Sequence, residues 1–366
     1  MKIAHLINSL ATGGAEKLVI DTVPLYQQAG IITDVIVANG TQYPFFQQLQ
    51  ESGQGKIISL GLGSVYNPLL VFKLMRLINN YDIIHVHLFP VQYFAVVAKW
   101  LSRSKVKFVF TEHSTYNRRI SNRLFLPVEK KIYVSYNIVI CISNEIKNIY
   151  TAYLPILNNL HLINNGVNTN KIENATNYNP SDINCLIKEL DKLIIQVSSF
   201  QEPKDQATLI KAVAILPQEV KLLLVGEGIE KEKCQKLVKQ LDLSDRVFFL
   251  GVRMDVPQLL KTADIVVLSS KYEGLSLSSI EGMASGKPFI ASNVSGLSDI
   301  VSGAGLLFEC GNETELAQHI NELLNNSILY QNTAAACLER AQEFTIEKMV
   351  VAHIELYNTL FNDKQA

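Results

Sequence analysis

The feature that most constrains the fold is an alternation of short apolar runs with longer segments of helical periodicity. The runs "KIAHLI", "TDVIVA", "KIISL", "DIIHVHL", "KFVFTEH", "NIVICIS" and "LHLINNG" are rich in β-branched residues and predict buried strands. Between them, segments such as residues 16–29 and 68–79 have the apolar spacing of helices. Strands this apolar need cover on both faces, so the alternation predicts a parallel sheet with right-handed crossover helices.

The same pattern occurs a second time. It weakens in a polar, Asn-rich stretch at about residues 168–184 and resumes with "KLIIQVSS", "VKLLLVG", "RVFFLG", "ADIVVLSS", "KPFIAS" and "AGLLFE". A length of 366 residues is typical of two domains. We expect an α/β chain with two doubly wound, Rossmann-like domains that face a cleft, where ligands bind beyond the carboxyl ends of the strands. The expected boundaries are an N-terminal domain at 1–170, a linker at 171–190, a C-terminal domain at 191–345 and a final helix at 346–366.

Composition excludes several classes of protein. Hydrophobic residues make up 48% of the chain and charged residues 18%, which is typical of a globular protein. The net charge of −1 and the lack of a nucleic-acid motif argue against nucleic-acid binding. The five cysteines are far apart, as in a reducing compartment, and no apolar run is long enough for a signal peptide or a membrane span. We therefore expect a cytoplasmic protein with no metal ligands and no cofactor.

Charge is distributed unevenly along the chain. Residues 1–170 hold 15 Lys and Arg against 8 Asp and Glu, a balance of +7, whereas the remainder holds 18 against 26, a balance of −8. A basic first half and an acidic second half are an asymmetry that a functional hypothesis has to explain.

The first loop of interest is "NSLATGGAEK". Gly13 and Gly14 allow a ligand to approach the backbone, and the helix that follows directs free N–H groups toward it. A glycine turn before a helix is also common without a ligand. The stretch lacks Gly-x-Gly-x-x-Gly and a Walker lysine, which argues against dinucleotide oxidoreductases and P-loop ATPases.

Histidines mark the ends of two strands. His113 follows the strand "KFVFTE", where its side chain could enter the cleft or serve only as a structural hydrogen-bonding group. We expect His85 and His87, which flank Val86, to project to opposite faces of their strand and not to share a metal ion.

The second half contributes two more loops. In "VSSFQEPKDQATLIKA", Lys204 precedes a helix start, a position that suits a phosphate, although a solvated lysine fits equally well. In "KYEGLSLSSIEGMASGKP", successive backbone N–H groups meet a helix start, which forms an anion site suited to a diphosphate without a metal. Glu281 could then accept hydrogen bonds from ribose hydroxyls, and Glu273 from those of a sugar. We expect Ser278 or Ser279 to cap the helix.

Taken together, these motifs resemble a family. "GGAE", "TEH", "PKDQATLIKA", "LLLVGEG" and the Glu-x7-Glu stretch "EGLSLSSIE" with "GMASGKPFIAS" look like the GT4-type retaining glycosyltransferases (glycosyl transferases group 1) of the GT-B fold, in their order and over nearly the whole chain. The resemblance implies a nucleotide-sugar donor, preferably a UDP-sugar, held by the second domain. It also implies a saccharide or lipid-linked acceptor held mostly by the first, with the anomeric configuration retained.

The resemblance also implies roles for individual residues. His113 would line the sugar pocket and stabilise the reacting centre, Lys204 would neutralise the leaving diphosphate, and Glu273 would bind sugar hydroxyls. The leaving phosphate itself would take the acceptor proton, so stabilising its developing charge is the main catalytic work. Gly13 and Gly14 would contact the donor through the glycine loop, and Arg253 would lie near the base. In the Glu-x7-Glu stretch, Gly274, Leu275 and Ser276 would face the sugar and the diphosphate, and Glu281 would hold the ribose.

One position departs from the family pattern. Many members have an arginine five positions before the lysine, where this chain has Ser199. The donor phosphate would lose a bidentate cation there, unless Arg253 or the pair Arg118 and Arg119 compensates.

Two helical segments remain. The stretch around Arg118 to Lys131 mixes basic and apolar residues, so it could rest on anionic lipid at the inner face of a membrane or be only a solvated basic helix. Residues 346–366 predict an amphipathic helix. By resemblance it would pack against the first domain, although the pattern fits equally well a helix of the second domain's own core.

Two alternatives to a transferase stay open. A nucleotide-sugar epimerase or a phosphorylase can use the same architecture; the first would convert the donor without an acceptor and the second would require phosphate. Ser199 also motivates a non-catalytic sugar-nucleotide-binding scaffold, which would bind nucleotide without turnover.

Overall fold

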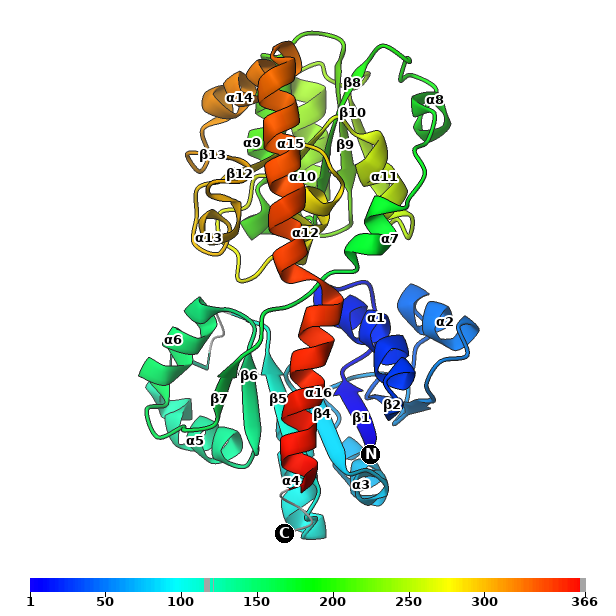
Figure 1. Cartoon of the computed structure of the whole chain (residues 1–366), viewed down its shortest axis with the longest axis vertical. Coiled ribbons are helices and arrows are strands. Elements are labelled where there is room, and N and C mark those ends of the chain that lie inside the picture. The colour runs from blue at the N-terminus through cyan, green and yellow to red at the C-terminus, as the bar shows by residue number, and fades with distance from the viewer. Residues whose placement is uncertain (115–118, 121, 363–366) are drawn as a thin grey trace. The chain divides into compact units, whose positions relative to one another are not determined.

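The computed structural model describes residues 1–114, 119–120 and 122–362. It divides into two compact units, one formed by Met1–Gly166 with Ile346–Ala366 and the other by Val167–Thr345. Figure 1 shows that each unit is a sheet flanked by helices. The chain therefore leaves the first unit after Gly166 and returns to it at Ile346.

The first unit contains a seven-stranded parallel sheet with the order β3-β2-β1-β4-β5-β6-β7. Its strands are β1 (Lys2–Ile7), β2 (Ile32–Val37), β3 (Ile57–Ser59), β4 (Ile83–His87), β5 (Lys107–Glu112), β6 (Ile138–Cys141) and β7 (Leu160–Leu162). Its helices are α1 (Gly14–Gln28), α2 (Pro44–Glu51), α3 (Leu70–Leu77), α4 (Val91–Ser102), α5 (Leu126–Val134), α6 (Asn144–Tyr153) and α16 (Ile346–Asn362), with 3₁₀ turns η1 (Ile78–Asn80) and η2 (Arg123–Phe125).

The second unit contains a six-stranded parallel sheet with the order β10-β9-β8-β11-β12-β13. Its strands are β8 (Lys192–Val197), β9 (Val220–Val225), β10 (Val247–Gly251), β11 (Ile265–Leu268), β12 (Phe289–Ser292) and β13 (Leu306–Phe308). Its helices are α7 (Thr169–Glu173), α8 (Pro180–Ile183), α9 (Gln206–Ala214), α10 (Lys231–Gln240), α11 (Val256–Thr262), α12 (Leu277–Ala284), α13 (Ser298–Val301), α14 (Glu313–Asn325) and α15 (Ser327–Ala341), with 3₁₀ turns η3 (Glu202–Lys204) and η4 (Gln342–Phe344).

The predicted α/β class with two parallel sheets is confirmed. Every apolar run named above overlaps one strand. Helix ends differ by a few residues. The helix predicted at 16–29 begins at Gly14, because extended Gly13 is its N-cap, and the one predicted at 68–79 is shortened to α3 with η1 after it.

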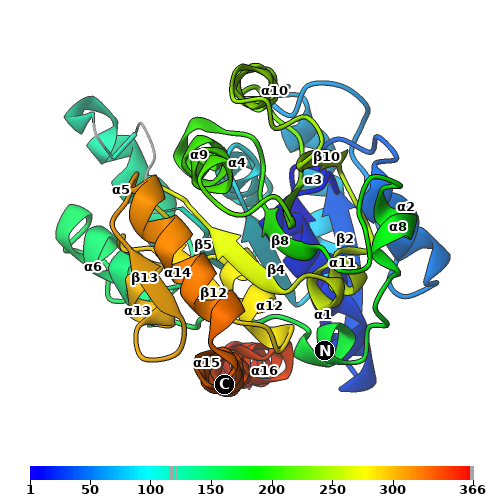
Figure 2. The same cartoon turned by 90° about the horizontal axis from the view of Figure 1, so that it is seen from above.

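Helices cover both faces of the second sheet, as Figure 2 shows for α9 and α10 on one side and α11, α12 and α15 on the other. Alternate residues along each strand pack into two separate cores. Leu222 and Leu224 belong to the core beneath α9, α10 and α14, whereas Leu223 and Val225 belong to the core beneath α11, α12 and α15. This two-sided burial explains why the strands read as continuous apolar runs.

The Asn-rich stretch belongs to the second unit. It carries α7 and α8, and Ile172 and Ile187 from residues 171–190 are buried in that unit's core. Polar composition alone therefore did not distinguish a linker from a segment anchored by two isoleucines.

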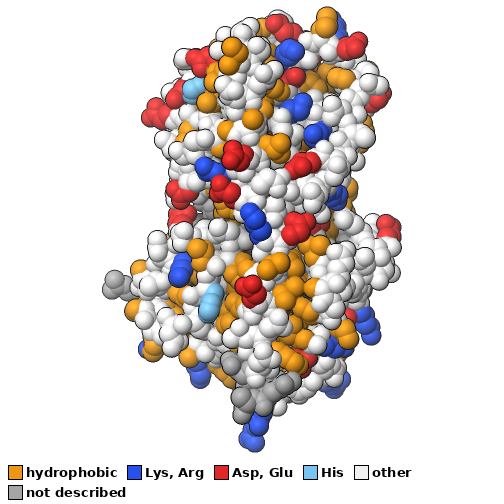
Figure 3. All heavy atoms as spheres, viewed as in Figure 1, with side chains coloured by type: hydrophobic (Ala, Val, Ile, Leu, Met, Phe, Trp, Pro, Cys, Tyr) orange, Lys and Arg blue, Asp and Glu red, His pale blue; other side chains and the backbone are white. Residues whose placement is uncertain are grey.

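Helix α16 belongs to the first unit. It contacts α1, and two of its buried side chains make hydrogen bonds to the rest of the unit: Tyr26 Oη lies 2.6 Å from His353 Nδ1, and Tyr357 Oη lies 2.5 Å from His85 Nδ1. Hydrophobic side chains gather along and beside this helix on the face in Figure 3. Among the described residues, no helix has both the length and the apolar character needed to cross a bilayer.

Candidate active site

The order of the second sheet determines where a ligand can bind. From β8 the chain moves toward β10, and from β11 it moves the opposite way toward β13. The loops after β8 and β11 therefore run in opposite directions at a topological switch point, which is the usual ligand position in doubly wound sheets. Lys204 lies in the first of these loops and Glu273 in the second.

The structure brings Lys204 and Glu273 into direct contact. Lys204 Nζ lies 2.5 Å from Glu273 Oε1, and Ser270 Oγ donates a hydrogen bond of 2.7 Å to the same oxygen. The lysine side chain is 24% exposed and the glutamate 9%, so the pair is largely shielded from solvent. Both contacts use Oε1, which leaves Glu273 Oε2 for another donor. The sequence singled out these two residues separately but did not indicate that they pair.

A buried network fixes the loop that carries Lys204. Gln196 Nε2 donates to the carbonyl of Lys204 at 3.1 Å, and its Oε1 accepts from Ser269 Oγ at 2.9 Å. Gln206 Nε2 donates to the carbonyl of Ser199 at 3.0 Å. Gln196 and Ser269 are fully buried. The polar position of Gln196 within the apolar run "KLIIQVSS" is the signal that could have found this network.

A glycine supports the loop that carries Glu273. Gly296 has φ +80°, and a Cβ placed there would lie 2.1 Å from the carbonyl oxygen of Gly274 and 2.3 Å from that of Glu273. Only a residue without a side chain allows this close approach. Gly296 was not predicted as a site residue; the available signal was the glycine within "NVSGLSD", after an apolar run.

Helix α12 provides backbone donors beside the pair. It begins at Leu277, and its N-cap Ser276 makes no side-chain capping bond. The expectation that Ser278 or Ser279 caps the helix is therefore wrong. Both residues lie inside the helix, and Ser279 Oγ instead donates to the carbonyl of Ser276 at 2.7 Å. The first-turn N–H groups are thus left for another acceptor, which is the arrangement that binds anions.

Glu281 lies in the second turn of α12, where its side chain is buried. Gly274 and Leu275 are half-buried in the loop before the helix, and Ser276 is buried at its start. The second glutamate of the Glu-x7-Glu stretch is thus built into the helix and the first into the loop.

Arg253 is held by its own carboxylate. Its Nε and Nη2 lie 2.8 and 2.5 Å from the two carboxylate oxygens of Asp255, which also accepts from Tyr178 Oη at 2.7 Å. Chiefly because of the Arg253 hydrogen bonds, the pKa of Asp255 falls to about 2. Ser199 is exposed. Asp255 engages Nε and Nη2 of Arg253, the arginine that could compensate for the positive charge missing at Ser199.

Arg118 lies outside the described residues, but Arg119 is placed. Its Nε lies 2.8 Å from Glu129 Oε1, and its guanidinium stacks 4.1 Å from the ring centroid of Phe89. Glu129 is fully buried and also accepts from Tyr93. Arg119 is therefore part of an internal ion pair of the first unit.

In the first unit, Gly13 and Gly14 form the start of α1. Gly13 is the N-cap, and the carboxylate of Glu16 lies over it, since a Cβ on Gly13 would be 2.3 Å from Glu16 Oε2. Burial raises the pKa of Glu16. An acidic group at this helix start makes it less suited to a diphosphate than the start of α12.

His113 follows β5 and is half-buried, and burial lowers its pKa to about 4. The expectation that His85 and His87 face opposite sides of their strand is wrong, because residues two apart on a strand share a face. Their ring centroids are 4.3 Å apart, and their donor atoms with those of His5 lie within 4.8 Å of one another. The strand faces of these histidines therefore do not exclude a shared metal ion.

Comparison with known proteins matches both halves of the chain. The family model "Glycosyltransferase Family 4" matches residues 12–171, and the model "Glycosyl transferases group 1" matches residues 183–344. The N-acetyl-alpha-D-glucosaminyl L-malate synthase of Bacillus anthracis is 29% identical over 301 residues, which cover 78% of this chain and 76% of that protein.

Two further proteins are similar along nearly their whole length. One is the Campylobacter jejuni N-acetylgalactosamine-N,N'-diacetylbacillosaminyl-diphospho-undecaprenol 4-alpha-N-acetylgalactosaminyltransferase, 24% identical over 91% of this chain and 93% of that protein. The other is a crystal structure of Anabaena HepE in complex with UDP-glucose, with a TM-score of 0.84 and 24% identity over 98% of this chain and 100% of that one. With both halves matched by glycosyltransferase models, the chain belongs to the family 4 glycosyltransferases and has the GT-B fold.

Proposed function

We propose that this transferase moves a sugar from a UDP-sugar to a glycan or lipid-linked saccharide, retains the anomeric configuration and uses neither a metal ion nor a cofactor. The observation that carries the proposal is the Lys204–Glu273 pair beside the open start of α12. The ammonium group and the helix N–H groups would hold the diphosphate, and Glu273 Oε2 would hold sugar hydroxyls. Glu281 would accept hydrogen bonds from the ribose.

The proposed mechanism concentrates catalysis on the leaving group. As the bond between the anomeric carbon and the phosphate oxygen breaks, negative charge grows on the diphosphate. Lys204 and the α12 N–H groups stabilise that charge while the acceptor hydroxyl oxygen bonds to the anomeric carbon, and the departing phosphate takes the proton of that hydroxyl. No protein nucleophile is needed. From the first unit, Gly13, Gly14 and His113 would contact the donor sugar.

The choice of UDP and of the acceptor class is supported by relatives. HepE was crystallised with UDP-glucose, and the Campylobacter protein is named for transfer to a saccharide on diphospho-undecaprenol. By analogy, this chain would act in the biosynthesis of a cell-surface polysaccharide.

Thermal unfolding with UDP, GDP, ADP and their sugars tests donor binding. A nucleotide at 100 times its dissociation constant should stabilise the protein by about 2.7 kcal/mol. We expect UDP and one UDP-sugar to stabilise the wild type and a Glu322→Ala control, since Glu322 is an exposed residue of α14, but not Glu281→Ala. Absence of any nucleotide effect at millimolar concentration would contradict the proposal.

Product analysis then separates the alternatives. Transfer to a saccharide acceptor with EDTA present, and with the donor's anomeric configuration in the NMR spectrum of the product, is the expected result. Donor conversion without acceptor would indicate an epimerase, and a requirement for phosphate would indicate a phosphorylase. Binding without turnover would leave the scaffold, consistent with Ser199.

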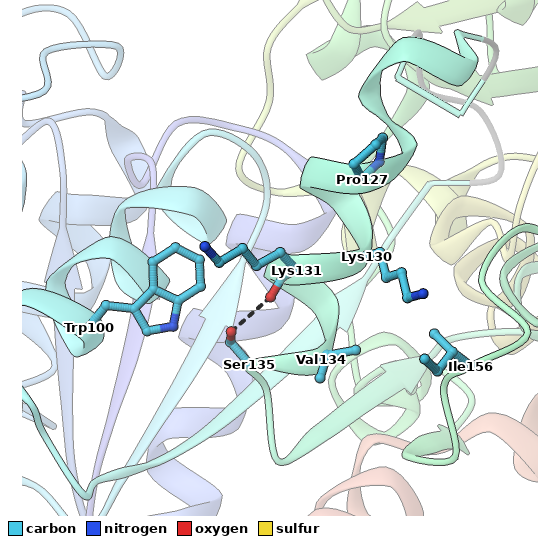
Figure 4. A pocket seen from close by; sticks show the side chains of 7 residues that line it. All are labelled: Trp100, Pro127, Lys130, Lys131, Val134, Ser135 and Ile156. Carbon is cyan, nitrogen blue, oxygen red and sulfur yellow. Dashed lines mark hydrogen bonds between the residues drawn. The ribbon is translucent and has the colours of Figure 1, made fainter.

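A specific surface favours a second proposal, contact with anionic lipid. A pocket of about 390 Å³ is lined by Trp100, Pro127, Lys130, Lys131, Val134, Ser135 and Ile156. Figure 4 shows the two lysines beside these apolar side chains, with Lys131 Nζ 4.9 Å from the ring centroid of Trp100. Trp100 is 41% exposed, and Val134 and Ile156 are each 55% exposed. Glu129, the acidic residue of α5, is buried and paired with Arg119, so the charge that α5 exposes to solvent is positive.

Such a surface combines an aromatic anchor with cations, as membrane-surface segments do. At about 1 kcal/mol per lysine, Lys130→Ala with Lys131→Ala should weaken binding to phosphatidylglycerol vesicles roughly 30-fold. Lys236→Ala with Lys239→Ala, two exposed lysines of α10, is the matched control. Equal cosedimentation with phosphatidylcholine vesicles, or equal binding by both double variants, would contradict lipid contact through this surface.

A further inference from the structure

Five histidines gather on one face of the first unit's sheet. They come from four separate segments: His5 from β1, His85 and His87 from β4, His113 from the end of β5, and His353 from α16. The strand register explains the grouping, because His5 is paired with His85 and His87 is paired with Thr111 on adjacent strands. His5, His85, His87 and His353 are buried, and only His113 keeps partial exposure.

Three of these imidazoles form a continuous chain of hydrogen bonds. His5 Nδ1 lies 3.0 Å from His87 Nε2, and His87 Nδ1 lies 3.1 Å from His113 Nε2. His85 is not a link in this chain, because its two nitrogens contact Thr111 Oγ1 at 2.6 Å and Tyr357 Oη at 2.5 Å. His87 is therefore the only imidazole of the described residues that bridges the half-exposed His113 to the interior.

A chain of neutral imidazoles has only two possible proton arrangements. Each neutral ring has one N–H and one lone pair, so both hydrogen bonds must run in the same direction. Burial lowers the pKa of His5 to about 3 and also lowers that of His87, which keeps both rings neutral at neutral pH. The position of one proton in the chain therefore determines the others.

The buried end of the chain decides the direction. His5 Nε2 is buried and has no hydrogen-bond partner within the part of the chain that the structure describes. If His113 donated toward the interior, His5 Nε2 would be a buried N–H without an acceptor. If His5 donates outward, the atom without a partner is only a lone pair. Buried N–H groups without an acceptor are rarer than acceptors without a donor, so the outward direction is favoured.

We infer that His5 and His87 are positioning residues that hold His113 in the tautomer with its proton on Nδ1. His87 Nδ1–H donates to His113 Nε2, and His113 Nδ1–H is left to donate to a ligand oxygen. Among the described residues, His113 Nδ1 makes no hydrogen bond. The inference rests on the proposed function only in taking that ligand to be the sugar of the donor.

Two substitutions at His87 separate positioning from packing. Asparagine can place a polar group near the position of Nδ1, which contacts His113. Glutamine can place one near the position of Nε2, which contacts His5. His87→Asn should preserve the link to His113 and His87→Gln should break it, with similar loss of ring packing in both. His161→Asn, in exposed β7, is the control for labelling and folding.

The first readout is the tautomer of His113 itself. Full-length protein with ¹⁵N-labelled histidine, prepared with EDTA, gives long-range ¹H–¹⁵N correlations for its seven imidazoles, and His113→Gln assigns the signal. We expect a protonated Nδ1 in the wild type and in His87→Asn, and a shift toward protonated Nε2 in His87→Gln. A protonated Nε2 on His113 in the wild type would overturn the inference.

The second readout is turnover. We expect kcat to fall at least tenfold more in His87→Gln than in His87→Asn, with the KM for the donor alike in both. Equal kcat values would also overturn the inference. If His87→Gln does not fold, His5→Asn, which keeps a donor near Nδ1, and His5→Leu, which does not, give the same comparison. Because the spectrum needs no turnover, an inactive wild type with the expected tautomer would refute only the proposed function.

Discussion

Replacing Gly296 with alanine should displace the loop that carries Glu273. The new Cβ would lie 2.1 Å from the carbonyl oxygen of Gly274, whereas ordinary contacts begin near 3.4 Å, so the loop must move by about 1 Å. A displacement of that size typically costs about 100-fold in turnover. The φ of +80° adds roughly 1–2 kcal/mol of backbone strain.

Gly303→Ala is the matched control in the same unit. Its φ is +77°, but nothing lies within 4 Å of the new Cβ. Both variants should lower Tm by roughly 2–8 °C through strain, while only Gly296→Ala should lose kcat/KM and UDP affinity. Differential scanning calorimetry and donor titration measure the two effects. If Gly296→Ala bound and turned over the donor as well as Gly303→Ala, the assignment of the Glu273 loop to the donor site would be refuted.

Three further predictions concern charge. Lys204→Ala should weaken UDP-sugar binding about 10- to 100-fold, as expected for a hydrogen bond to a charged group. Lys271→Ala, which removes one partner of an exposed ion pair, should leave the affinity unchanged, and titration calorimetry measures both affinities. The hydrogen bonds of Arg253 lower the pKa of Asp255 in the folded state, so Asp255→Asn should reduce the free energy of unfolding by about 1–2 kcal/mol above pH 4. Urea unfolding should show this difference from the wild type shrinking as the pH falls to 2. Burial lowers the pKa of His353 to about 3 from 6.5, so below pH 6.5 the unfolded chain binds more protons than the folded one and the free energy of unfolding decreases as the pH falls. His353→Asn should make this decrease smaller between pH 6.5 and 4.

The fold was predictable because burial on both faces leaves a strong pattern. Runs such as "VKLLLVG" are short, have few polar residues and end at a glycine, which favours strands covered on both faces. Segment boundaries were less predictable. Ile172 and Ile187 anchor a polar stretch as isolated buried side chains, with Tyr178 and Ile183 packed beside them, and the average composition of the stretch does not show this.

The site was predictable residue by residue but not as an arrangement. Lys204 and Glu273 are 69 positions apart, and their contact arises only when β8 and β11 become neighbours in the sheet. The histidine chain was missed for the same reason, compounded by a wrong assignment of strand faces. Arg253 shows the effect of a contact between near neighbours in the sequence. Asp255, two positions away, accepts hydrogen bonds from the arginine that the resemblance assigns to a ligand.

The return of the chain to the first unit has a consequence for protein synthesis. All of Val167–Thr345 emerges from the ribosome before α16, so the second unit can complete its fold while the first still lacks a helix. During that interval Tyr26 and His85 have no partners from α16, and the face of the sheet that α16 will cover is open to water or to a chaperone. The unit that is translated first therefore cannot complete its core until residues 346–362 have been translated.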